Sequence, residues 1–192
     1  MGGKLSLNNK REDFETFVDV FQELTVGTSL SVIGGGSDNT FFATNGSVGG
    51  GVKLAFAGDA DCRMGFDSIG GPVTAVLGVG DENVFNTFGV AVKGPISVTS
   101  SADVSSMFLS GTSEGTSIRY TGGAGADEVD LQMVAPRATA TLDVGAGDDR
   151  VNLFDDGSLV LKRFDIDFGE GTDRFFPGAY VPPAGSKIEN LP

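Results

Sequence analysis

The chain has 192 residues, including 30 glycines, and its 26 acidic and 13 basic side chains leave a formal net charge of −13. A chain of this length makes one domain by default. It contains no histidine and one cysteine, Cys62, which excludes histidine-based nucleophile sites, histidine-ligated metals and an internal disulfide. The acidic balance argues against a nucleic-acid partner, and no apolar run approaches the ~20 residues that span a bilayer.

Residues 1–27 are predicted to cap the domain. Their apolar residues follow the spacing of one face of a short helix: Phe14, Phe17, Val18, Phe21 and Leu24. A strand is the alternative, because one repeat period back from Asp38 lies Thr16, and this alignment places Val18 and Val20 at inward strand positions. We favour the helix, and in both cases expect these aromatic residues to belong to the core or the cap.

A glycine-rich pattern, Gly-x-Gly-x-Asp, recurs in the second half of the chain. The three full copies end at Asp127, Asp149 and Asp173, at nearly equal steps along the sequence. An apolar residue follows each aspartate by two positions, and the alternation continues, which is typical of a strand. Further steps of nearly the same length towards the N-terminus reach Ser105, Glu82, Asp61 and Asp38 in degenerate copies. We count seven copies, over about residues 28–177.

A second set of alternating segments precedes these patterns. Its members are Val52–Phe56, Ile96–Val98, Ile118–Tyr120, Ala140–Val144 and Phe164–Phe168. Each repeat is therefore interpreted as strand, glycine-rich turn, strand and second turn, which is shorter than the ~30 residues of a βαβ unit. The fold we predict is all-β: a right-handed parallel β-helix of about seven 22-residue coils over 28–177, followed by a proline-rich tail at 178–192.

Residues 122–130 match every specified position of the nonapeptide Gly-Gly-x-Gly-x-Asp-x-apolar-x. The chain therefore resembles the haemolysin-type (RTX) calcium-binding repeat family, although it carries one such motif per 22-residue coil and Ser105 interrupts the series. The resemblance implies Ca²⁺ bound between stacked coils. It implies these ligands: the carboxylates of Asp127, Asp149 and Asp173, the carbonyls of Gly123, Gly125, Gly145, Gly147, Gly169 and Gly171, and the weaker matches Asp38 and Glu82.

Elementary electrostatics also points to a cation. Carboxylates stacked ~4.8 Å apart would repel by about 0.9 kcal/mol per pair in water and about 3.5 kcal/mol at an effective dielectric constant of 20. Calcium, which takes 6–8 oxygen ligands, would turn this repulsion into attraction. The alternative is that each aspartate caps its own turn through backbone N–H groups, and this is the interpretation we favour for Asp38, Asp61 and Glu82.

Two functions remain open. An enzyme that cleaves polysaccharides would need paired carboxylates, and Asp165 and Asp167 lie ~6.6 Å apart on one strand face, with Asp143 one coil away, within the range of an inverting pair. Charged outward positions are more often solvated, however, and the loops are short. We therefore predict a non-enzymatic, extracellular or cell-surface structural or adhesive module that binds calcium and contacts other surface proteins or glycans. Residues 1–11 lack the apolar segment of a secretory signal, so we expect a trimmed form or another export route.

Overall fold

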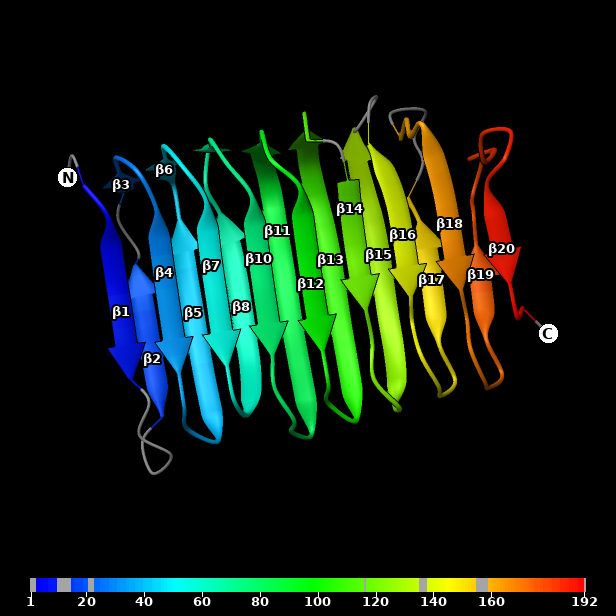
Figure 1. Cartoon of the computed structure of the whole chain (residues 1–192), viewed down its shortest axis with the longest axis horizontal. Coiled ribbons are helices and arrows are strands. Elements are labelled where there is room, and N and C mark those ends of the chain that lie inside the picture. Colours follow the sequence, from blue (N-terminus) through cyan, green and yellow to red (C-terminus); the bar gives the residue numbers. More distant parts are fainter. Residues whose placement is uncertain are drawn as a thin grey trace.

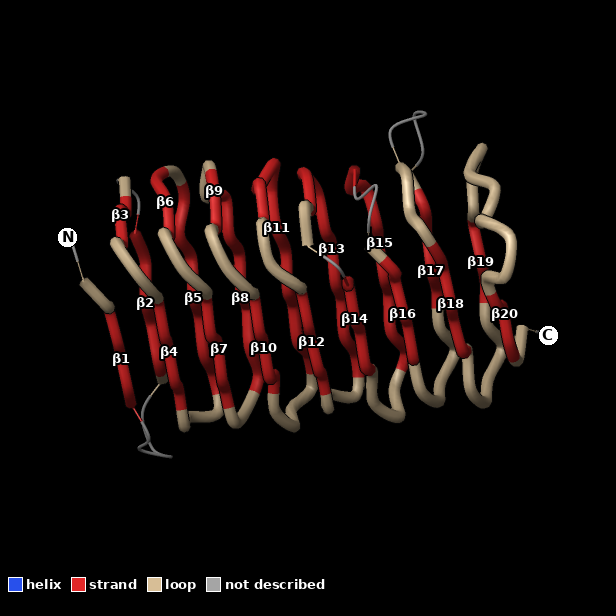
Figure 2. The backbone as a smooth tube through the Cα atoms, turned by 45° about the horizontal axis from the view of Figure 1, so that its top comes forward, coloured by secondary structure: helices blue, strands red, loops and turns tan. Residues whose placement is uncertain are grey.

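The computed structural model describes residues 3–9, 15–20, 23–115, 117–134, 138–154 and 159–191, with only the backbone of 133 and 134. These residues form strands and turns, without a helix (Figure 2). One sheet, sheet A, has nine strands: β1 (Leu5–Asn9), β4 (Leu30–Gly34), β7 (Val52–Phe56), β10 (Val73–Leu77), β12 (Ile96–Ser100), β14 (Ser117–Thr121), β16 (Thr139–Asp143), β18 (Arg163–Asp167) and β20 (Lys187–Glu189).

The second sheet, sheet B, lies behind it, and its main path has eight strands: β2 (Thr16–Val20), β5 (Asp38–Thr44), β8 (Asp59–Gly65), β11 (Glu82–Val92), β13 (Val104–Ser113), β15 (Ala126–Val134), β17 (Arg150–Leu153) and β19 (Arg174–Phe176). Three short strands extend it: β3 (Leu24–Val26), β6 (Gly46–Val48) and β9 (Ser68–Ile69). The chain passes from a sheet-A strand through a turn to a sheet-B strand and back, so that successive coils advance along the molecule (Figure 1). All pairs between these strands are parallel, and the predicted β-solenoid is confirmed.

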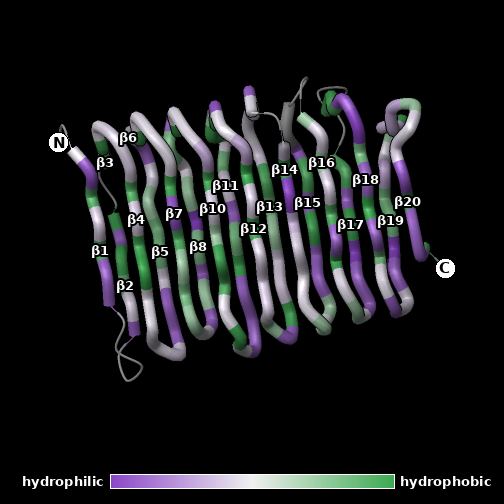
Figure 3. Tube along the Cα trace, in the orientation of Figure 1, coloured by the Kyte–Doolittle hydropathy of each residue, from purple (hydrophilic) through white to green (hydrophobic). Residues whose placement is uncertain are grey.

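Alternating side chains hold the coils together. In β7, for example, Val52, Leu54 and Phe56 are buried and Lys53 between them is exposed. Leu54 lies in register with Val32 of the coil before and Ala75 of the coil after, so each coil covers the apolar side chains of its neighbours. Figure 3 shows the same alternation along most strands. Because no coil buries its core alone, the fold depends on stacking.

The turns from sheet A to sheet B bring successive backbones into close contact. Gly145 and Gly147 adopt φ angles of +96° and +129°, in the region that favours glycine. A Cβ atom at either position would also collide with a carbonyl oxygen of the preceding coil, that of Gly123 or Gly125. The glycine-rich turns therefore stack directly, as the repeat predicted.

Two predictions about the ends of the domain need correction. The N-terminal helix is wrong: Thr16–Val20 is a strand that pairs with β5, while Phe14 and Phe21 lie outside the described residues. The pairing gives the backbone its hydrogen bonds and leaves Phe17, a residue of the expected apolar helix face, 70% exposed. At the other end, Lys187–Glu189 of the predicted tail pairs with β18. The solenoid therefore extends beyond residues 28–177 and has about eight coils rather than seven.

Candidate metal centre

A buried column of side chains follows the turns from sheet A to sheet B. Strand register places one residue of each coil in it, and we call this set the inner column: Thr16, Asn39, Ala60, Asn83, Ser105, Asp127, Asp149 and Asp173. All eight residues are buried. The predicted stacking of Asp127, Asp149 and Asp173 is thus confirmed, because the residues that follow them pair in register.

The three carboxylates of the inner column lie almost entirely out of solvent, with exposed fractions of 2% for Asp127, 1% for Asp149 and 7% for Asp173. The backbone N–H of Asp127 donates to Oδ1 of Asp149 at 2.8 Å, and that of Asp149 donates to Oδ1 of Asp173 at 2.9 Å. Both oxygens of Asp127 and Oδ2 of the other two receive no hydrogen bond from the described part of the chain. Four buried carboxylate oxygens therefore remain without a donor.

Burial makes charge costly at this position. It raises the pKa of Asp127 and that of Asp149 from 3.8 to about 6. The hydroxyls of Ser105 and Tyr120 and the backbone N–H of Gly123 lie close to Asp127 and oppose the rise in its pKa. At Asp149, repulsion from Asp127 and Asp173 adds to the effect of burial on the pKa. The column therefore favours a bound proton or a counter-ion.

Carbonyl oxygens of the turns lie in rows beside the aspartates. A Cβ atom at Gly169 would meet the carbonyl oxygen of Gly145, and one at Gly171 would meet that of Gly147. Together with the contacts of Gly123 and Gly125 described above, two glycine columns follow the turns. The predicted carbonyl ligands are thus stacked beside the inner column, in the coils that carry the aspartates.

One glycine marks the point where oxygen atoms meet. A Cβ atom at Gly122 would collide both with Oδ2 of Asp127 and with the carbonyl oxygen of Val144. Neither atom is a hydrogen-bond donor. An arrangement of carboxylate and carbonyl oxygens is the donor set that a hard cation such as calcium prefers.

The oxygen atoms available as metal ligands belong to both carboxylates and backbone carbonyls, rather than to a cluster of acidic side chains. Within the described ranges, no three acidic or cysteine side chains converge so that together they could hold one metal ion. A calcium ion would therefore be held by one or two carboxylates of the inner column, with turn carbonyls as the other ligands. Ligand sets of this mixed kind are usual for calcium.

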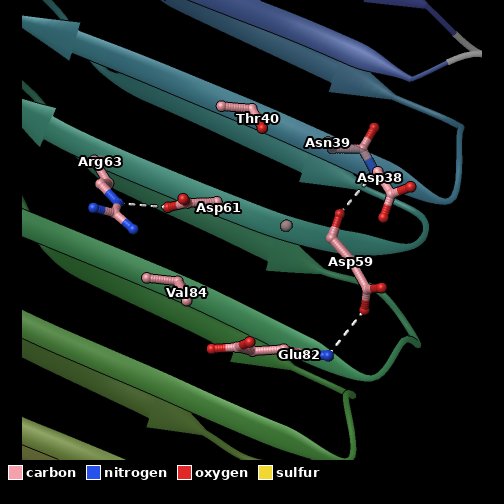
Figure 4. Close-up of a pocket in the computed structure, with 9 residues that line it drawn as sticks. Asp38, Asn39, Thr40, Asp59, Asp61, Arg63, Glu82 and Val84 are labelled. Carbon is pink, nitrogen blue, oxygen red and sulfur yellow. Dashed lines mark hydrogen bonds and ion pairs between the residues drawn. The ribbon is translucent and has the colours of Figure 1, made fainter.

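Two predicted ligands lie elsewhere. Asp38 pairs with Asp59, and Glu82 pairs with Val104. Both acids are exposed at the starts of their strands, where the backbone N–H of Glu82 donates to Oδ1 of Asp59 at 3.0 Å (Figure 4). Their predicted alignment with Asp127 is wrong by one residue.

The sheet-A register explains both shifts. Gly34 stands level with Gly122, not with Gly123, so Asn39 rather than Asp38 corresponds to Asp127. Leu77 stands at the same level, and the chain takes one residue more from there to the inner column than it takes from Gly122. Asn39 and Asn83 occupy the inner column in these coils instead.

Sequence reasoning missed these two amides. Asn39 donates through Nδ2 to the carbonyl oxygens of Gly36 at 3.0 Å and Asp59 at 3.1 Å. Asn83 donates to the carbonyl oxygen of Gly78 at 2.9 Å and to Oγ of Ser100 at 2.8 Å. Ser100 also bonds the hydroxyl of Ser105 at 2.8 Å. Strand alternation alone, followed back from Asp127 without preference for acids, would have found them.

Two of the three carboxylates considered for catalysis, those of Asp165 and Asp167, form bonds with neighbouring residues. Asp165 forms an ion pair with Arg163 at 2.7 Å and accepts the backbone N–H of Lys187 at 3.1 Å. Asp167 accepts the Nδ2 group of Asn190 at 2.7 Å. Asp143 stands in register with Asp167 on the outer face of sheet A. These contacts are structural ones, between adjacent coils and along one strand.

No protein-family model, curated protein or solved structure matches the chain. In the part of the chain that the structure describes, no helix has the length and apolarity needed to cross a membrane. Functional inference therefore rests on the chemistry of the inner column itself.

Proposed function

We propose that the protein is a calcium-reinforced structural module, similar to RTX repeats, that acts outside the cell or at its surface and is not an enzyme. One observation carries this proposal: Asp127, Asp149 and Asp173 are stacked and buried, and four of their six oxygens receive no hydrogen bond from the described residues. Uncompensated buried charges of this kind are strongly unfavourable.

Protons alone do not satisfy these carboxylates near neutral pH. The pKa values of Asp127 and Asp149 are about 6, so at pH 7 both groups are mostly ionised. A divalent cation neutralises two carboxylates at once and is also coordinated by the carbonyl oxygens of the turns. Calcium is thus the counter-ion that fits this column best.

Three stacked aspartates enclose two gaps between coils. We therefore expect no more than two calcium ions, one between the coils of Asp127 and Asp149 and one between those of Asp149 and Asp173. The residues proposed to hold them are these carboxylates, the carbonyl of Val144 and the glycine carbonyls at 123, 125, 145, 147, 169 and 171. When bound, calcium supplies positive charge and cross-links neighbouring coils.

A rigid stack suits a structural or adhesive role. Its outer surface carries exposed aromatic side chains on sheet B, among them Phe17, Phe88, Phe154 and Phe176, which offer contact area to other surface proteins or glycans. Extracellular calcium modules bind calcium with dissociation constants of about 10⁻⁴–10⁻³ M. A site of that affinity would be filled where calcium is abundant, which is consistent with the proposed location outside the cell or at its surface.

Thermal unfolding tests the proposal. Calcium at about 100 times its dissociation constant adds about 2.7 kcal/mol to the stability, which raises the Tm of a chain of this size by roughly 5–10 °C relative to EDTA. Magnesium at the same concentration controls for ionic strength and should give little of this shift, because it demands a tighter octahedral site.

Two variants locate the effect. Asp149→Ala, in the middle of the column, should abolish most of the calcium shift. Asp38→Ala, at an exposed position outside the column, should retain it. Identical melting curves of the wild type in calcium and in EDTA would remove calcium from the proposal.

A further inference from the structure

The inner column changes its chemistry part-way along the solenoid. The five coils nearest the N-terminus contribute uncharged residues: Thr16, Asn39, Ala60, Asn83 and Ser105. The next three contribute aspartate. Strand pairing continues in parallel across this boundary, from β13 to β15. The same corner of the solenoid is therefore occupied by uncharged side chains in five coils and by carboxylates in three.

In the uncharged part, side-chain amides donate to the oxygens that face them. Asn39 bonds carbonyl oxygens of its own turn and of the next coil, and Asn83 bonds a turn carbonyl and Ser100. Each Nδ2 group carries two N–H donors, and each makes two hydrogen bonds here. These amides join adjacent strands and turns through Nδ2, while Oδ1 of each receives no hydrogen bond from the described residues.

In the acidic part, the corresponding positions have only acceptors. Gly34 and Gly122 occupy the same level of sheet A. A Cβ atom at Gly34 would meet Oδ1 of Asn39 and the hydroxyl of Thr16, whereas one at Gly122 would meet Oδ2 of Asp127 and a carbonyl oxygen. Oδ1 of Asn39, like Oδ2 of Asp127, receives no hydrogen bond from the described residues, so the two corners differ in charge rather than in the number of unbonded oxygens. An amide is neutral, whereas a buried ionised carboxylate requires a counter-ion.

We propose that the amides of Asn39 and Asn83 take the place of calcium in the N-terminal coils, so that calcium holds folded only the coils from β14 to β19. On removal of calcium, the strands from β14 to β19 and the described turns between them open, while the strands from β4 to β13 stay folded. This inference rests on the proposed function, because it assigns the proposed calcium to one part of the solenoid. The uncharged coils then serve as a permanent template on which the acidic coils assemble.

Hydrogen exchange measured by mass spectrometry on the full chain tests the location. Calcium should slow exchange in peptides from residues 117–176 by at least about tenfold relative to EDTA, and change exchange in residues 30–100 by less than about twofold. Equal slowing in both regions would overturn the inference and leave the calcium proposal intact. No slowing in either region would overturn the calcium proposal, and the inference with it.

Replacing aspartate by asparagine tests the chemistry. In Asp149→Asn, Oδ1 can still accept the N–H of Asp127, and the new Nδ2 group replaces the oxygen that lacks a donor. The triple variant Asp127→Asn, Asp149→Asn, Asp173→Asn should exchange in EDTA as slowly over residues 117–176 as the wild type does in calcium, and should not respond to calcium. Exchange as fast as that of the wild type in EDTA would overturn the inference.

Single variants keep the test decisive if the triple variant does not fold. Asp149→Asn alone should slow exchange over 117–176 in EDTA relative to the wild type, and equal or faster exchange contradicts the inference. The reciprocal variant Asn83→Asp places a carboxylate between Ala60 and Ser105, where no second acid stands in the column. It should speed exchange in β11 and β12 both with and without calcium. Full rescue by calcium would contradict the assignment of these coils.

Discussion

The N-terminal and C-terminal coils solve one structural problem in two ways. At the inner corner, where each sheet-A strand turns into sheet B, every coil but that of Ala60 places a polar side chain beside the turn. Asn83 donates its own N–H groups to the oxygens that face it. Asp149 offers only acceptors, takes one backbone N–H and leaves its other oxygen unbonded. Asn83 and Asp149 differ in one side-chain atom, an amide nitrogen in place of a carboxylate oxygen, and we propose that this atom decides whether a coil requires calcium.

The two regions should therefore respond differently to pH, metal and mutation. The uncharged coils contain no titratable group in the inner column, so their stability should vary little with pH or calcium. The aspartate coils contain two carboxylates with pKa values raised to about 6. Each prediction below separates the regions by one of these responses.

The largest expected effect is on the pH dependence of stability without metal. Because the folded pKa values lie above 3.8, the folded state binds more protons, and stability is lost as pH rises through about 6. In EDTA, the free energy of unfolding should fall between pH 4 and 7 by up to about 3 kcal/mol per carboxylate. Denaturant unfolding at a series of pH values measures this.

The control for pH is Asp127→Asn, Asp149→Asn, which keeps nearly all of the surface charge and should lose most of this fall. A wild type whose stability does not decline from pH 4 to 7 any more than that of the variant would contradict the role of these two groups. Calcium should reverse the trend, since binding requires the ionised carboxylates.

Adding a methyl group beside the column should have the next largest effect. Gly122→Ala and Gly34→Ala both place a Cβ against column side chains, and overpacking of this kind costs about 1–3 kcal/mol. Both variants should lower Tm, but only Gly122→Ala should reduce the shift that calcium produces. If Gly34→Ala reduced the calcium-induced Tm shift as much as Gly122→Ala does, the two regions would not differ in their dependence on calcium.

Ser100→Ala should weaken the uncharged region alone. Ser100 links Asn83 to Ser105, and loss of a buried hydrogen-bond partner costs about 1–3 kcal/mol. The loss should be the same in calcium and in EDTA. Ser97→Ala, on the outward side of the same strand, is the matched control and should change stability by less than about 0.5 kcal/mol. A loss that calcium restores would place Ser100 in the metal-dependent part.

The smallest effect is expected on the outer face of the aspartate coils. Arg150 and Glu128 form an ion pair across adjacent coils at 3.5 Å, with about half of each side chain exposed. Glu128→Gln should cost about 0.5 kcal/mol or less, with the calcium shift unchanged. A large loss of the calcium-induced Tm shift in this variant would indicate that the metal binds at the outer face rather than in the inner column.

The fold was predictable because strand alternation and a regular repeat period require no knowledge of side-chain contacts. The stacking of Asp127, Asp149 and Asp173 was predictable for a related reason: each aspartate follows its sheet-A strand through a turn of the same length, although the steps between them are 22 and 24 residues. Residues 16–20 were misjudged because helical and strand spacing coincide over a few apolar residues, and pairing with β5 decides between them.

The uncharged part of the column was not predictable in the same way. Acidic residues drew the alignment to Asp38 and Glu82, whereas the strand register places the residues that follow them, Asn39 and Asn83, in the column. An amide carries no charge that marks it in a sequence, and its role depends on which carbonyl oxygens face it. The strand register decides which of the two neighbouring residues enters the column, and so reveals the contrast between the two regions.

Isothermal titration of the full chain with calcium at pH 7 tests the central claim most directly. We predict saturable binding of no more than two ions, lost in Asp149→Ala and retained in Asp38→Ala. Binding that survives Asp149→Ala unchanged, or no binding heat in the wild type, would contradict a calcium site in the aspartate column.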